Sequence, residues 1–234
     1  MTALVGVLTF PGSNGDQDAL HALVDDVGVA ARLVDYRERD LAPFSAIVLP
    51  GGFSYGDALR CGAIARFAPV MASLRAFADR GGPVLGICNG FQILTEAHLL
   101  PGALLRNRTL RFHSHRTHIR IDQPDTFWTM NLEPGAVLTL PVAHGEGAYF
   151  ADSETLERME ANGQVVARYC DPAGQVSEET NPNGSVESIA AVANERRNVV
   201  GLMPHPERAT NRLIGGDDGL RILNAALNVL GVPA

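Results

Sequence analysis

Cys88 lies in the sequence pattern that points most directly to chemistry. An apolar run at residues 83–87 leads into Gly86, Cys88 and Gly90 at alternate positions, and a helix-like segment follows. A strand that turns sharply into a helix presents its turn residue as a nucleophile elbow. We expect the two glycines to permit a strained turn and to leave room for a substrate, while the helix N-terminus favours the thiolate. Cys88 is therefore the candidate nucleophile for attack on a carbonyl.

A thiolate nucleophile needs a proton carrier, and seven histidines are available. His205 stands out because it follows an apolar run at residues 199–203 and precedes Pro206 and Glu207. Pro206 biases His205 towards an extended backbone, where residues two apart project to the same side. Glu207 is then placed to orient the imidazole, and Cys88, His205 and Glu207 make a set of nucleophile, base and orienter. Taken alone, the same turn also fits a rigid corner with a solvated carboxylate.

Acyl transfer also requires backbone donors for the oxyanion of its tetrahedral intermediate. The apolar stretch at residues 47–49 ends in Pro50, Gly51 and Gly52, a loop without long side chains. This loop can offer one N–H group. The amide of Asn89, directly after the nucleophile, can offer the second.

The elements that position these residues follow from the hydrophobic pattern. In residues 3–100, short apolar strands alternate with amphipathic helices, which is typical of βαβ units around a parallel sheet. We predict strands at residues 4–10, 32–34, 46–49 and 84–87, and helices at 16–27 and 60–79.

The second half of the chain has a different pattern. Shorter alternating stretches separated by Gly, Pro and Asn turns indicate antiparallel strands added to the same domain. We predict such strands at residues 137–142, 165–169 and 188–192, a surface loop at 171–185, a returning strand at 199–203, and a closing helix with Leu220, Leu223, Leu227 and Leu230 on one face. The sequence thus predicts a single α/β domain over residues 1–234.

Composition excludes several functional classes. The 26 acidic and 19 basic residues give a formal net charge of −7, whereas nucleic-acid binders and anionic-membrane binders need cationic surface. Every basic residue is arginine, so a lysine Schiff base and the lysine of a phosphate-binding P-loop are both impossible.

Cys61, Cys88 and Cys170 are too few and too scattered for a disulfide framework or a zinc site, which favours a reducing cytoplasm. The first apolar run has no basic leader, and we read it as a buried strand.

Three motifs in this order are similar to those of the class I, triad-type glutamine amidotransferases: the Leu-Pro-Gly-Gly at residues 49–52, the Gly-Ile-Cys-Asn-Gly-Phe-Gln at 86–92 and the Pro-His-Pro-Glu at 204–207. Further stretches at 10–14, 52–57, 100–107 and 143–147 resemble the glutaminase subunits of phosphoribosylformylglycinamidine synthase, an enzyme of purine biosynthesis. The resemblance spans nearly the whole chain.

This resemblance implies a flavodoxin-like, doubly wound, mostly parallel sheet with antiparallel decoration. It implies that Cys88 is the nucleophile, His205 the acid and base, and Glu207 its orienter. It further implies that Gly52 contributes to the oxyanion hole, and that Gln92 and the backbone of His144 and Gly145 hold the glutamine. The implied partner is an ATP-dependent synthase subunit, with or without a small third subunit. No cofactor is expected in this chain, and ATP and Mg²⁺ are expected in the synthase.

Two departures from the family pattern stand out. Gly15 occupies a position where the family usually carries a cysteine, and the segment from Phe112 to His118 is richer in histidine than usual. His113 and His115 would share a strand face with His118 on the other, which is too few convergent ligands for a metal. We therefore expect no metal site.

Other readings stay open from the sequence alone. One is a glutaminase for a different ammonia-dependent synthase, and another is a cysteine hydrolase on a related fold. A third is a non-catalytic scaffold, against which the intact Cys, His and Glu set counts. His144 and Glu146 also resemble a second catalytic pair, but adjacent residues on an extended chain point to opposite faces.

Overall fold

The apolar strands of the N-terminal half form the parallel part of a twisted sheet. The computed structural model describes residues 4–229. Within these residues the main sheet has nine strands in the order β2-β1-β3-β4-β11-β10-β9-β6-β7. The parallel strands are β1 (Leu4–Thr9), β2 (Ala30–Asp35), β3 (Ala46–Leu49), β4 (Val84–Ile87) and β11 (Val199–Leu202). Their spatial order is that of flavodoxin-like doubly wound folds, as predicted.

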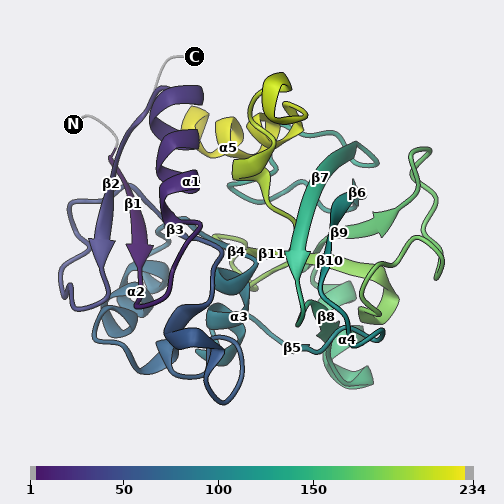
Figure 1. Cartoon of the computed structure of the whole chain (residues 1–234), viewed down its shortest axis with the longest axis horizontal. Helices are drawn as coiled ribbons and strands as arrows, with labels where there is room; N and C mark the ends of the chain where they lie inside the picture. The colour runs from purple at the N-terminus through teal and green to yellow at the C-terminus, as the bar shows by residue number, and fades with distance from the viewer. Residues whose placement is uncertain (1–3, 230–234) are drawn as a thin grey trace.

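Antiparallel strands extend this sheet. They are β10 (Ile189–Ala193), β9 (Val165–Cys170), β6 (His113–Ile121) and β7 (Val137–His144). Figure 1 shows them on the side of the molecule away from β1 and β2. A separate two-stranded sheet pairs β5 (Ala103–Leu105) with β8 (Ala148–Phe150). The predicted antiparallel decoration therefore mostly continues the main sheet.

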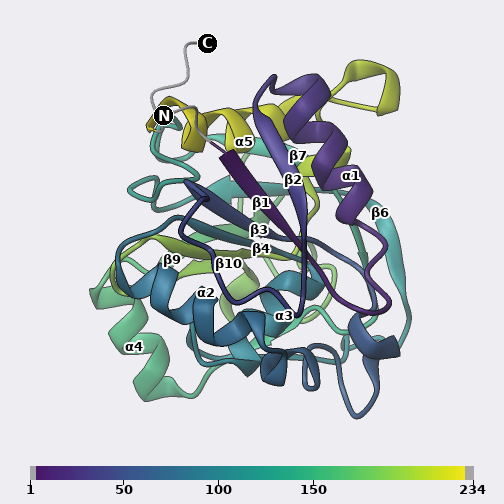
Figure 2. The ribbon, with the colours of Figure 1, turned by 90° about the vertical axis from the view of Figure 1, so that its left-hand side faces the viewer.

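Helices cover both faces of the sheet. They are α1 (Asp16–His21), α2 (Val70–Asp79), α3 (Asn89–Glu96), α4 (Ser153–Ala161) and α5 (Asp218–Val229). Figure 2 shows α1 and α5 on one face and α2, α3 and α4 on the other. No helix of the described residues is long and apolar enough to cross a membrane.

Two helix predictions need correction or restriction. The helix predicted at residues 60–79 begins only at Val70. Gly62 has a φ of +78°, which is not helical, and a short 3₁₀ turn follows. Pro69 then directly precedes the first residue of the α-helix. In the closing helix Leu223 is buried and Leu220 is half-buried. The side chain of Leu227 and all of Leu230 lie outside the described part of the chain.

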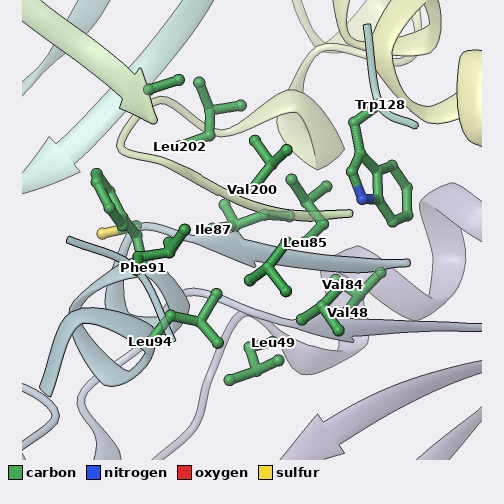
Figure 3. Close-up of a cluster of buried hydrophobic side chains, with 14 of the residues drawn as sticks. Val48, Leu49, Val84, Leu85, Ile87, Phe91, Leu94, Trp128, Val200 and Leu202 are labelled. Atoms are coloured by element: carbon green, nitrogen blue, oxygen red, sulfur yellow. The ribbon is translucent and has the colours of Figure 1, made fainter. Parts of the chain in front are cut away.

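The core side chains of the central strands pack against α3. Figure 3 shows Phe91 and Leu94 of this helix beside Ile87 and Leu49 at the strand ends. A Cβ on Gly201 would come within 2.0 Å of the Phe91 ring, so this glycine lets the helix lie directly on the sheet. This close packing fixes the start of α3, and therefore Cys88, relative to the ends of β3, β4 and β11.

Candidate active site

Cys88 occupies the sharp turn between β4 and α3. Its backbone has φ +49° and ψ −103°, a conformation that non-glycine residues rarely adopt, and its side chain is buried. The Cys88 N–H donates to the Leu202 carbonyl of β11 at 2.8 Å, which fixes the turn to the neighbouring strand. The elbow predicted from the sequence is present, with the thiol at the N-terminus of α3.

The glycines beside Cys88 have a different role from the one predicted. Neither Gly86 nor Gly90 has a positive φ, so the strain rests on Cys88 itself. A Cβ on Gly90 would lie 2.0 Å from the Leu49 carbonyl oxygen, and one on Gly86 would lie 2.5 Å from Leu94. The glycines therefore allow close packing of the helix against the strands.

His205 and Glu207 follow β11 and lie next to the elbow. The Nδ1 of His205 is 2.6 Å from Oε1 of Glu207, and both side chains are buried. Residues Pro206–Arg208 form a 3₁₀ turn, so an extended segment is not what aligns the two side chains, contrary to the prediction. His205 itself is extended, and its N–H donates to the Pro141 carbonyl of β7 at 2.8 Å.

Charge in this pair favours the imidazolium. Burial lowers the pKa of His205, but the Glu207 carboxylate and Cys88 outweigh it and raise this pKa to about 10. The Sγ of Cys88 donates to the Ala143 carbonyl at 3.7 Å, and Nε2 of His205 is buried without a hydrogen-bond partner among the described residues. The imidazole thus keeps one nitrogen on Glu207 and the other free for a reacting group.

The edge of β7 closes the site, which the sequence pattern did not reveal. Two of its carbonyls, on Pro141 and Ala143, accept hydrogen bonds from His205 and Cys88. Coiling of the sheet brings this edge strand back to the carboxyl ends of β4 and β11. Strand alternation at residues 137–142 could identify β7, but only the long-range path of the sheet decides what its edge meets.

The loop after β3 lies against the side chains of Cys88 and His205. A Cβ on Gly51 would lie 2.7 Å from Cε1 of His205 and 3.6 Å from the Cβ of Cys88. Gly15 N–H donates to the Gly51 carbonyl at 3.1 Å, and a trans peptide therefore directs the Gly52 N–H away from Gly15. The backbone of this loop thus lies next to Cys88 and His205, and its role as an oxyanion donor stays a prediction.

The His144–Gly147 turn forms another wall, held by two asparagines that sequence reasoning missed. Asn107 is fully buried; its Nδ2 donates to the His144 carbonyl at 2.8 Å and its N–H donates to the Gly145 carbonyl at 2.9 Å. Asn183, also fully buried, donates to the Gly147 carbonyl at 2.8 Å. The sequence carried no signal for these two asparagines, because their role depends on burial, which obliges their amides to find partners.

His144 does not pair with Glu146. Its Nδ1 lies 3.1 Å from Oδ1 of Asn107, while Glu146 Oε2 accepts from the Cys61 N–H at 3.4 Å. Burial first, and then His205 and the nearby histidines, lower the pKa of His144 to about 3. The side chain is therefore neutral near pH 7, and its carbonyl is already engaged by Asn107.

The other cysteines favour the protonated thiol. Burial and the carboxylates of Glu146 and Asp57 raise the pKa of Cys61 far above its usual range. Burial likewise raises the pKa of Cys170 to about 11. Since the thiolate is the nucleophile, these two cysteines are poor candidates for attack at neutral pH.

The histidine-rich strand β6 has the predicted arrangement. The rings of His113 and His115 share a face, with centroids 5.7 Å apart, whereas His118 lies on the other face and contacts Thr139 Oγ1 at 3.1 Å. No group of three or more metal-ligating side chains is assembled within the described residues.

Known proteins place this geometry in a family. Residues 2–215 match the CobB/CobQ-like glutamine amidotransferase domain. The chain is 60% identical over 223 residues to phosphoribosylformylglycinamidine synthase subunit PurQ of Thermomicrobium roseum, covering 95% of this chain and 94% of the relative. It is 51% identical over 234 residues to the same subunit of Salinibacter ruber, with full coverage of both.

A solved structure agrees. One chain in the structure of PurLQS from Thermotoga maritima matches with a TM-score of 0.87 and 42% identity, covering 98% of this chain and 100% of that one. The chain therefore belongs to the glutamine amidotransferases and, among them, to the PurQ subunits of phosphoribosylformylglycinamidine synthase.

Proposed function

We propose that this chain is the glutaminase subunit of phosphoribosylformylglycinamidine synthase in purine biosynthesis, and that it uses Cys88, His205 and Glu207. One observation carries the assignment of residues. The elbow cysteine, the buried His205–Glu207 pair and the Gly51–Gly52 loop meet at the carboxyl ends of three adjacent strands, β3, β4 and β11. In doubly wound sheets this edge is where ligands bind.

The reaction runs in two steps. The Cys88 thiol gives its proton to Nε2 of His205, and Sγ attacks the carboxamide carbon of glutamine and forms a C–S bond, while backbone N–H groups of Gly52 and Asn89 stabilise the oxyanion. The C–N bond then breaks, and His205 gives its Nε2 proton to the departing ammonia. Water then gives a proton to Nε2 of His205 and attacks the thioester carbon. The C–S bond breaks, His205 returns the proton to Sγ of Cys88, and glutamate leaves.

Glu207 keeps this cycle electrostatically favourable. Its carboxylate accepts from Nδ1 of His205, which fixes the proton-carrying tautomer and stabilises the imidazolium. Gln92, His144 and Gly145 are proposed to contact the glutamine. Since the carbonyls of His144 and Gly145 already accept hydrogen bonds, this turn is expected to offer its N–H groups.

The ammonia is consumed elsewhere. A sequence without lysine cannot form the usual phosphate-binding loop, so an ATP-dependent synthase subunit, with its ATP and Mg²⁺, is the proposed partner, together with a small third subunit. The similar chain from Thermotoga maritima belongs to the PurLQS structure, which supports such a complex. We further propose that residues 1–234 form one domain and that the protein is located in the cytoplasm.

Covalent trapping tests the proposal. A chloroketone analogue of glutamine should modify Cys88 stoichiometrically, located by peptide mass spectrometry, and glutamine should protect it. The assembled complex should release glutamate from glutamine. Modification of Cys61 or Cys170 instead, or stronger reaction with a peptide chloroketone, would contradict the assignment and favour a different cysteine hydrolase.

A further inference from the structure

A line of buried polar groups crosses the first turn of α3 and joins two walls of the active site. The Ser54 N–H donates to Oδ1 of Asn89 at 3.1 Å, and Nδ2 of Asn89 donates to Oε1 of Gln92 at 2.9 Å. Nε2 of Gln92 then donates to the Glu146 carbonyl at 2.6 Å. Ser54, Asn89 and Gln92 are each at most 4% exposed. We call this chain of hydrogen bonds the amide relay.

The direction of the amide relay is fixed at both ends. A backbone N–H can only donate and a carbonyl can only accept, so neither amide is free to flip without breaking a bond. Ser54 N–H at one end and Glu146 carbonyl at the other determine how Asn89 and Gln92 are oriented. Both side chains are neutral, so the relay does not depend on pH near neutrality. Buried hydrogen bonds in series also reinforce one another, and an unmade one is costly.

The two ends of the relay belong to the parts that act on the substrate. Ser54 follows Gly52, the proposed oxyanion donor, and Glu146 follows His144 and Gly145, the proposed glutamine-binding turn. A second contact runs in parallel, since the Cys61 N–H donates to Oε2 of Glu146 at 3.4 Å. The segment after β3 is thus tied to the turn after β7 at two places.

The relay is separate from the packing that holds α3 in place. Phe91, Ile93 and Leu94 of the same helix are fully buried in the core. Loss of an amide hydrogen bond therefore leaves the helix anchored but frees the loop that carries Gly52. That loop has glycines at its centre and can reorient its peptide at low cost.

We infer that Asn89 and Gln92 are positioning residues whose side chains lock the oxyanion loop to the glutamine-binding turn, so that both walls adopt the competent geometry together. The inference rests on the proposed function, because it assigns a role within that reaction. Asn89 has two parts in it: its N–H is a proposed oxyanion donor, and its side chain holds the opposite donor in place through Ser54.

Neutral substitutions of similar size test the inference in the assembled complex. Asn89→Leu should lower kcat for glutamate release about 10- to 100-fold, a fraction of the 10² to 10³ lost with a whole oxyanion donor, while KM for glutamine stays within about threefold. The pH profile of kcat should keep its shape, because no charge changes. Gln92→Met should lower kcat and also raise KM for glutamine, because Gln92 is also a proposed contact of the substrate.

The double variant and a control complete the design. Because either substitution breaks the same relay, Asn89→Leu with Gln92→Met should lower kcat little more than the worse single change. Thr95→Val is the matched control: this residue is buried on the same helix and its hydroxyl donates only to the Gln92 backbone carbonyl, at 2.9 Å. It should leave kcat and KM unchanged.

The possible failures can be told apart. A wild-type complex that releases no glutamate from glutamine refutes the proposed function itself. A wild-type complex that is active, with both single variants within twofold of its kcat, refutes the relay alone. Multiplicative losses in the double variant also refute it. If circular dichroism shows that Asn89→Leu does not fold, Gln92→Met decides the matter, because its loss of kcat is measured without the double variant.

Discussion

Replacing Glu207 by glutamine isolates the electrostatic part of the His205–Glu207 pair. Oε1 of Glu207 lies 2.6 Å from Nδ1 of His205 and 3.7 Å from Nε of Arg208. Arg208 favours an oxygen at this position, so the glutamine amide should keep its oxygen towards His205. The hydrogen bond and the tautomer then persist, and only the negative charge is lost.

The size of the effect follows from the pKa of His205. This pKa rises from 6.5 to about 10 despite burial, which corresponds to about 5 kcal/mol in favour of the imidazolium. Glu207 and Cys88 both contribute, so we assign roughly half of that to Glu207. The predicted loss in kcat/KM for glutamine hydrolysis is therefore about 10²-fold. His205→Ala removes the base altogether and should cost more, about 10⁴-fold or above.

The assay is glutamate release by the assembled complex as a function of pH. With the charge gone, the pKa of His205 falls, so the alkaline limb of the profile should move to lower pH in Glu207→Gln. In the wild type the folded pKa lies above the unfolded one, so the pair stabilises fully below about pH 6.5 and progressively less as pH rises towards 10. The difference in Tm between wild type and variant should therefore be largest near pH 6.

Glu157→Gln, an exposed change on α4, serves as the control and should alter neither the rate nor its pH profile. The reasoning is refuted if Glu207→Gln and His205→Ala lose equal activity together with equal Tm. That outcome would assign this turn a structural role.

Three further predictions concern the nucleophile and its loop. Cys88→Ala should abolish glutamine-dependent synthesis in the assembled complex and spare ammonia-dependent synthesis, because only amide cleavage needs the thiolate; parallel loss of both in an intact complex contradicts it. The isolated chain should be a weak glutaminase whose kcat rises when the loaded synthase is added, because a docked partner can favour the competent Gly51–Gly52 peptide; full activity without partner would exclude this control. Gly51→Ala should lower kcat by at least about 10²-fold, because its methyl group meets the imidazole at 2.7 Å. Gly28→Ala, at a φ of +79° and with nothing within 4 Å, should lower stability but leave kcat unchanged.

Local patterns in the sequence predicted the class of the fold and the candidate reactive residues. Alternating apolar strands and helices predicted the parallel sheet, because side-chain periodicity depends on backbone geometry over a few residues. A glycine-flanked cysteine after an apolar strand predicted the elbow in the same way. The Pro-His-Pro-Glu turn predicted that His205 and Glu207 meet, although the 3₁₀ turn that aligns them is not the extended segment that the pattern indicated.

Tertiary structure alone decided what surrounds these residues. The carbonyl edge of β7 meets Cys88 and His205 because the sheet coils through nine strands, a path that no local pattern records. In the sequence Asn107 does not differ from any other loop asparagine. Its role in holding the His144 carbonyl depends on burial, because a buried amide needs hydrogen-bond partners. The strained backbone conformation likewise lies at Cys88 itself. The glycines on either side of it are required for another reason, because they pack closely against Leu49 and Leu94. Contacts between distant segments depend on how whole elements pack, and the sequence specifies that packing only through the sum of many weak interactions.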